Sequence, residues 1–103
     1  TKKLISLMLY FPDEGVTYGD AAGTDFYRGK NGTPAWSAWK IGMLRDDRAA
    51  QFYSEHETFH SSPFEGNRLI GFVKSSVSWH GLKALQIPPG ATRRSVNINY
   101  HAI

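Results

Sequence analysis

Polar and apolar residues alternate strictly in the last strand that the sequence predicts, over residues 93–100. One face is polar and the other is mainly apolar: the first carries Arg93, Ser95, Asn97 and Asn99, and the second carries Val96, Ile98 and Tyr100. A period of two predicts a β-strand whose faces lie in different environments. The polar row either faces water or lines a wet pocket inside a barrel, and the pattern alone leaves both interpretations open.

Short apolar segments that end at Gly or Pro recur along the rest of the chain. Residues 4–11 predict a buried strand with one mixed face and one wholly apolar face, made of Ile5, Leu7, Leu9 and Phe11. Further strands are expected at residues 24–28, 57–60, 68–73 and 77–82, and residues 46–53 have a helical composition. This spacing favours an all-β fold of the sandwich or barrel type, jelly rolls included.

The size and composition of the chain narrow its class. A length of 103 residues fits a single domain with one core, spanning residues 1–103. The aromatic content of 14% is high and favours a β-rich chain with a lined cavity. The net charge is +3, but the basic residues are scattered. We therefore expect no nucleic acid partner, whereas a small anionic molecule suits this charge.

The cysteine count and the hydropathy pattern bear on the cellular compartment of the protein. The chain contains no cysteine, which excludes disulfides and thiolate metal sites and agrees with a reducing compartment. We expect a cytoplasmic protein. No apolar run approaches the roughly eighteen residues that a membrane span requires, so no membrane partner is expected. The expected partner is a small-molecule or peptide substrate.

One histidine and one arginine stand out for the chemistry that they could share. His80 lies in the predicted strand at residues 77–82, and Arg93 opens the last strand thirteen residues later. A neutral imidazole is the commonest metal ligand, and a planar guanidinium binds a carboxylate through two hydrogen bonds. Ser95 and Asn97 could add neutral hydrogen bonds to the same anion, and Tyr10 could add its hydroxyl.

Each of these residues also has a purely structural interpretation. His80 could be a core or surface histidine, Tyr10 a core aromatic, and Arg93 a solvated charge. Arg94 is the alternative carboxylate ligand, although it lies on the apolar face of its strand, where an arginine must snorkel or pair.

Other candidate groups are better explained as structure. His56 and His60 would suit zinc only on a helix, and the Ser-Ser-Pro that follows them disfavours one. The adjacent carboxylates at 13–14 and 46–47 point apart, which disfavours acid–base catalysis. The remaining aromatics either cover a barrel mouth, bind a substrate or form plain core: Trp36, Trp39, Phe52 and Tyr53.

Three stretches of the chain, taken in order, resemble the C-terminal part of the 2-oxoglutarate- and Fe(II)-dependent dioxygenases, in particular the prolyl-hydroxylase-like branch. Residues 4–12 (LISLMLYFP) resemble the strand that follows the family's first metal motif. Residues 67–81 (NRLIGFVKSSVSWHG) resemble its distal-histidine hairpin, and residues 93–95 fit its Arg-x-Ser signature. The likeness spans nearly the whole chain, with a loose match over residues 15–64.

The resemblance implies a double-stranded β-helix of the jelly-roll, cupin-like type, incomplete at its N-terminal side. It implies that the complete protein uses Fe(II) and 2-oxoglutarate to hydroxylate a C–H bond of a primary substrate that the sequence does not reveal. On this model His80 is the distal iron ligand. Arg93 pairs with the far carboxylate of 2-oxoglutarate, and Tyr10 supports that contact.

One departure from the family pattern is serious. The family's other two iron ligands form a His-x-Asp motif just before the strand at residues 4–11, and no His-x-Asp occurs in this chain. A lone imidazole cannot hold Fe(II) tightly. We therefore expect this chain alone to be inactive. It is either a piece of a longer protein cut just after the aspartate, which we favour, or a relative that no longer binds iron.

Two non-enzymatic functions are the alternatives. A jelly roll with an aromatic mouth could bind a carbohydrate or a small organic anion without any metal. An incomplete barrel could also pair its exposed strand edges between two copies and form a homo-oligomer.

Overall fold

The computed structural model describes residues 2–19, 22–37, 44–81 and 87–103. In chain order the elements are β1 (Lys3–Tyr10), β2 (Thr24–Gly29), the short 3-10 helix η2 (Lys30–Gly32), α2 (Asp46–Glu55), β3 (His56–Ser62), β4 (Leu69–Val73), β5 (His80–Gly81) and β6 (Ser95–His101). The strands form two antiparallel sheets, ordered β4-β1-β6 and β3-β2-β5. The protein is therefore mostly β, as predicted, and the predicted helix is present and ends two residues later than expected.

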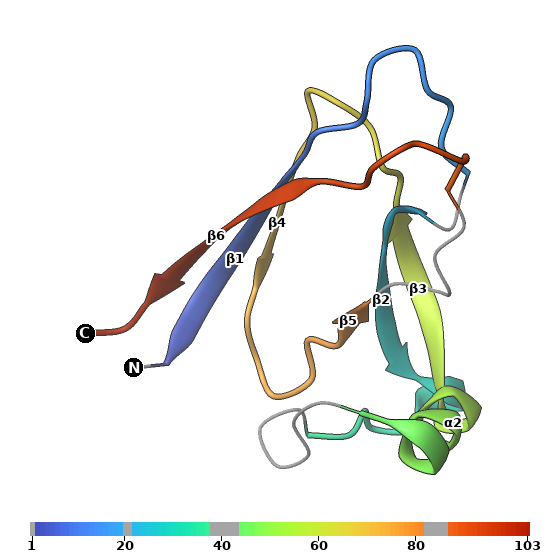
Figure 1. Ribbon diagram of the computed structural model, residues 1–103. Coiled ribbons are helices and arrows are strands. Elements are labelled where there is room, and N and C mark those ends of the chain that lie inside the picture. Colours follow the sequence, from blue (N-terminus) through green and yellow to red (C-terminus); the bar gives the residue numbers. More distant parts are fainter. Residues whose placement is uncertain (1, 20–21, 38–43, 82–86) are drawn as a thin grey trace.

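The two sheets lie opposite each other, with both chain ends at one end of the β4-β1-β6 sheet (Figure 1). Helix α2 lies beyond the ends of β2 and β3. Outer strands border each sheet, so β3, β4, β5 and β6 offer edges within the described part of the chain. Pairing of these edges between two copies stays a prediction. No helix in the described ranges is long and apolar enough to cross a membrane.

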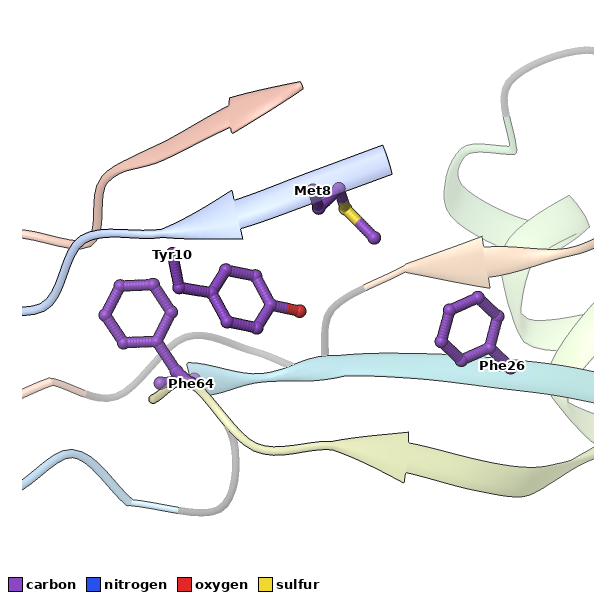
Figure 2. Packing of buried hydrophobic residues seen from close by; sticks show 5 residues of the cluster. Met8, Tyr10, Phe26 and Phe64 are labelled. Carbon is purple, nitrogen blue, oxygen red and sulfur yellow. The ribbon is translucent and has the colours of Figure 1, made fainter. Parts of the chain in front are cut away.

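The main core fills the space between the sheets. It is formed by buried residues of both sheets and of the loops that join them: Met8, Tyr10, Ala22, Phe26 and Phe64. Figure 2 shows Met8 and Tyr10 extending from β1 toward the layer that contains Phe26 and Phe64. The Tyr10 and Phe64 rings lie 5.0 Å apart between centroids. Burying a large apolar side chain contributes about 1.5–3 kcal/mol, so these few residues hold the two sheets together.

The face of β1 that points into this core is not the one that the sequence predicts. Ser6, Met8 and Tyr10, on the mixed face, are buried, whereas Ile5 is 40% exposed and Phe11 48% exposed on the apolar face. The expectation of a strand buried on both faces is therefore wrong. The mixed face can turn inward because its polar groups have partners there. The Ser6 hydroxyl, for example, donates a hydrogen bond to Oδ1 of Asn99, at 2.8 Å.

A second packed cluster joins α2 to the sheet that contains β2. Phe52, the buried residue of the helix, stacks on the His56 ring at 3.9 Å between centroids and also contacts Trp36 and Trp79. Trp36 and Phe52 therefore form core, and Tyr53 packs beside them against Phe52 at 5.5 Å. Trp39 lies outside the described residues.

The strand that carries His80 is shorter than the sequence predicts. β5 comprises only His80 and Gly81, which pair with Phe26 and Asp25 of β2, and Leu82 lies outside the described residues. Serine side chains account for the shorter strand. The Val77 N–H donates to Oγ of Ser75 at 3.2 Å, and the Ser78 N–H donates to the carbonyl of Ser75 at 3.4 Å. This local turn takes up backbone groups that an extended strand would use.

Candidate functional site

His80 and Arg93 line one cavity between the two sheets. The cavity has a volume of about 290 Å³. Its walls come from both sheets and from the start of the last strand: Met8, Thr24, His80, Gly81, Arg93, Ser95 and Asn97. The polar row of β6 borders this cavity, although Ser95, Asn97 and Asn99 are exposed to solvent. The apolar row lies on the opposite face and is also exposed, with Val96 47% exposed and Tyr100 55% exposed. Both interpretations of the alternating pattern therefore hold in part: the polar row lines a pocket, and that pocket is open to water.

Arg93 is held at the edge of this cavity by its carbon surface and by one hydrogen bond. Its Nε–H donates to the carbonyl of Ala22 at 2.7 Å. The guanidinium carbon lies 5.0 Å from the ring centroid of Phe64 and 5.5 Å from that of Tyr10, within range of cation–π attraction. Among the described residues, no hydrogen bond or ion pair occupies its two terminal nitrogens. The fork that binds carboxylates is thus oriented and still available.

Tyr10 lies behind Arg93 and is 2% exposed. Its hydroxyl is 2.5 Å from Oγ1 of Thr24, so the two residues form a hydrogen bond between the sheets. Thr24 lines the cavity, whereas Tyr10 does not. Tyr10 therefore acts as a positioning residue for Arg93, and Thr24 is the hydroxyl that faces the cavity. The sequence gives no signal for Thr24, because its role depends on which strand lies opposite β1.

His80 is partly open to solvent as a residue, but aromatic rings flank its imidazole at the cavity wall. Its ring centroid lies 4.8 Å from that of Phe72 and 6.3 Å from that of Phe26. Burial by the surrounding protein, followed by the positive charge of Lys74, lowers the pKa of His80 below its usual value. At neutral pH the ring is consequently uncharged, which is the form that binds a metal ion.

Arg94 occupies a different environment. Its Nη2 donates to Oδ1 of Asp13 at 2.7 Å, and its side chain is 61% exposed. Arg94 borders a wider depression of about 660 Å³ at the end of β1, which Phe11, Pro12 and Gly66 also line. Although this depression is larger, no histidine lines it. The structure thus brings Arg93, and not Arg94, to the cavity of His80.

The residues present fit a carboxylate better than a metal ion. Arg93 offers an oriented guanidinium for one carboxylate, and Ser95 and Asn97 lie on the same wall. Within the described ranges, no group of three or more His, Cys, Asp or Glu residues could hold a metal. His80 supplies one imidazole where an Fe(II) site needs three protein ligands, so the described residues by themselves do not fit iron.

His56 and His60 do not form a metal site. The His56 ring is buried, and its Nε2 accepts the Trp36 N–H at 3.0 Å. Because Nε2 is an acceptor, Nδ1 carries the proton and donates to the carbonyl of Phe52 at 2.8 Å. Both nitrogens are therefore satisfied, and His56 is a core residue. His60 is exposed and lies 6.0 Å from the Phe26 ring between centroids.

A smaller cavity of about 80 Å³ adjoins the first and shares Met8, His80 and Asn97 with it. Its other lining residues are Lys3, Ser6, Phe72, Lys74 and Asn99, of which the two lysines were not anticipated from the sequence. The alternation along β4 could have indicated Lys74 as a lining residue, because it comes two residues after Phe72 and falls on the same face. Lys3 could not be found in this way. A register shift between Lys3 and Ile5 breaks the alternation of β1 and brings Lys3 to the inner face.

The chain was also compared with models of known protein families, with curated proteins and with solved structures, and no significant match was found in any of the three comparisons.

Proposed function

We propose that this chain is the co-substrate-binding part of a 2-oxoglutarate- and Fe(II)-dependent dioxygenase with a double-stranded β-helix fold. Arg93 binds the far carboxylate of 2-oxoglutarate, with Ser95, Asn97 and Thr24 as neutral neighbours. His80 supplies one of the three iron ligands. When bound, iron and 2-oxoglutarate together supply the oxidising chemistry, which acts on a C–H bond of the primary substrate.

A single observation carries this proposal: His80 of β5 and Arg93, which lies two residues before β6, line the same cavity. A site for a chelating dicarboxylate needs a metal ligand at one end and a carboxylate ligand at the other. The opposed antiparallel sheets also support the fold, because a double-stranded β-helix consists of two such sheets.

The residues of this chain support a role in binding 2-oxoglutarate. Oxidation would require a site that has all three iron ligands. Because the described residues offer His80 as a single ligand, the proposal requires the other two ligands to come from elsewhere. Arg93 does not depend on the metal for its position, since its contacts are with Ala22, Tyr10 and Phe64. We therefore expect the chain to bind 2-oxoglutarate weakly without metal and to lack hydroxylase activity.

A pair of titrations tests the proposal. Calorimetry with 2-oxoglutarate should give saturable binding to the chain, while Mn(II), as an air-stable substitute for Fe(II), should bind only weakly. Adding a His-x-Asp segment ahead of residue 1 should raise the Mn(II) affinity, and His80→Ala should abolish that gain. If the extended protein binds Mn(II) no better than the original, the oxygenase function is wrong.

A non-enzymatic module for a small organic anion is the second candidate. Its support is the two adjoining cavities considered without metal: Arg93 lines one, two lysines line the other, and His80 lines both. The carbohydrate version of this candidate loses support, because Trp36 and Phe52 pack against each other at 5.6 Å and line neither cavity.

A further inference from the structure

The inner face of the β4-β1-β6 sheet ends in a row of basic residues, away from Arg93. Across the sheet, Lys3 of β1 pairs with His101 of β6. On the other side of β1, the Lys74 N–H donates to the carbonyl of Leu4 at 2.8 Å, which fixes Lys74 beside the start of β1. Lys3 and Lys74 both line the small cavity of about 80 Å³. Two lysines, one on β1 and one directly after β4, thus border one space.

A bulge at the start of β1 is the reason that Lys3 lies on the inner face of the sheet. In a regular strand, Lys3 would share the outward face with Ile5. The register shift between Lys3 and Ile5 places one additional residue, Leu4, on the β1 side of the pairing with β6. A bulge re-aims the side chains on one side of it, and here it brings Lys3 to the face of Ser6 and Met8.

Within the part of the chain that the structure describes, Lys3 and Lys74 have no acidic partner that would neutralise them. Among the described residues, the ion pairs that involve carboxylates lie elsewhere, at Glu57, Glu65 and Asp13. Lys74 lies 5.4 Å from the Phe72 ring centroid, a contact that orients the ammonium but leaves its charge unpaired. Burial, followed by the charge of Lys3, lowers the pKa of Lys74, as expected where two cations approach each other without an anion.

The remaining lining groups suit a small oxyanion. Asn97 and Asn99 supply amide groups, and Ser6 supplies a hydroxyl, which now donates to Asn99. A volume of about 80 Å³ corresponds to between two and three water molecules at about 30 Å³ each, enough for one carboxylate or phosphate group. Ammonium and amide donors around a space of this size are the groups that bind such anions.

We propose that Lys3 and Lys74 form a second anion-binding site, which binds a carboxylate or phosphate group in the small cavity that adjoins the cavity of Arg93. This site is separate from the 2-oxoglutarate contact at Arg93. It rests on the proposed function in one respect only: if the chain belongs to a dioxygenase, the bound anion is a group of the primary substrate, which is then an acid or a phosphate ester.

NMR titration of the 103-residue chain tests this site, with inorganic phosphate and acetate as separate probes at constant ionic strength. We expect saturable shifts of the backbone amides of residues 3, 74 and 99 with at least one probe. Saturation by acetate alone points to a carboxylate, and saturation by phosphate alone points to a phosphate group. Lys74→Gln and Lys3→Gln should each weaken binding about tenfold, because each removes a charged hydrogen-bond donor. Lys74→Arg should largely restore it.

Two control variants separate this site from general charge effects and from the proposed function. Lys30→Gln removes the same charge from an exposed position in η2 and should leave phosphate and acetate binding unchanged. Arg93→Met should weaken 2-oxoglutarate and leave the small-anion site intact. Shifts that never saturate, or equal weakening by Lys30→Gln, would overturn the second site. If Arg93→Met has no effect on 2-oxoglutarate while Lys74→Gln weakens phosphate, the proposed function fails and the second site stands.

Discussion

The hydroxyl of Tyr10 on β1 and Oγ1 of Thr24 on β2 lie 2.5 Å apart, and this hydrogen bond joins the two sheets at the ring over which Arg93 lies. The same tyrosine therefore links the sheets and supports the guanidinium. Its hydroxyl serves the first role and its ring the second. The two roles can be separated by substitution, because Phe keeps the ring and loses only the hydroxyl.

Tyr10→Phe should lower the free energy of unfolding by about 1 kcal/mol, the usual contribution of a buried hydrogen bond, and leave 2-oxoglutarate binding nearly unchanged. Thr24→Val should cost a similar amount. The double variant should cost less than the sum of the two, since either change removes the same bond. Urea unfolding of the four proteins measures this coupling. Strictly additive losses would show that the two hydroxyls do not interact.

Arg93→Met should weaken 2-oxoglutarate binding about tenfold or more, because the far carboxylate loses a charged, oriented partner. Arg94→Met is the matched control, since it removes the same charge from the neighbouring position. Arg94 is already paired with Asp13, so its loss should leave the affinity within about twofold. Calorimetry of both variants measures the difference. A larger loss for Arg94→Met would assign the carboxylate to the wider depression at the end of β1.

His56 and His60 both lie on β3 and form a second matched pair of positions, which tests contributions to the free energy of unfolding. His56→Ala should lower the free energy of unfolding by about 3 kcal/mol, because it removes a stacked buried ring and leaves the Trp36 N–H without its acceptor. His60→Ala changes an exposed residue of the same strand and should cost less than about 0.5 kcal/mol. Urea unfolding compares the two. Equal losses would mean that His56 is not the centre of the cluster around Phe52.

Tyr27 carries a buried hydroxyl that makes no hydrogen bond of normal geometry among the described residues, although the Tyr53 hydroxyl lies near it. Burial, and then the neighbouring Tyr53, raise the pKa of Tyr27 well above its usual range. Tyr27→Phe removes this polar group and keeps the ring, which packs against Phe52 at 5.6 Å between centroids. We expect the free energy of unfolding to stay the same or rise by about 1 kcal/mol, as measured in urea. A clear loss would show that the hydroxyl has a partner, such as an ordered water molecule.

Elements with a strong local pattern were predicted well from the sequence. The alternation of β6 is a direct consequence of strand geometry, so its polar and apolar rows lie on opposite faces as expected. The turn residues in the sequence also predicted the ends of β2 and β4 to within one residue. Arg93 was preferred over Arg94 on the basis of the Arg-x-Ser spacing, and the structure places those two side chains in different environments.

Properties that depend on distant parts of the chain could not be predicted in this way. The apolar face of β1 was expected to be buried, but which face turns inward depends on the strand that lies opposite, here β2 with Thr24 and Phe26. The position of Lys3 depends on a bulge that no local residue pattern announces. The shortness of β5 depends on hydrogen bonds between Ser75 and Ser78, which form a turn in place of an extended strand.

The lowered pKa of His80 makes the free energy of unfolding depend on pH. Burial and the charge of Lys74 lower this pKa in the folded protein, whereas in the unfolded chain it is about 6.5. Above pH 6.5 the ring is neutral in both states, and its contribution does not change. As the pH falls below about 6.5, the unfolded chain binds a proton that the folded chain still resists, so the folded state loses stability. The loss continues until the pH falls through the folded pKa.

His80→Gln should therefore flatten the fall in stability between neutral and mildly acidic pH. Urea unfolding at a series of pH values measures the difference between the variant and the original chain. Lys74→Gln removes the second cause of the lowered pKa while burial persists, so it should flatten the curve in part. Because His80 is partly open to solvent as a residue, we expect a modest effect. If the pH profile of His80→Gln matches that of the original chain, the imidazole does not lie in the environment described.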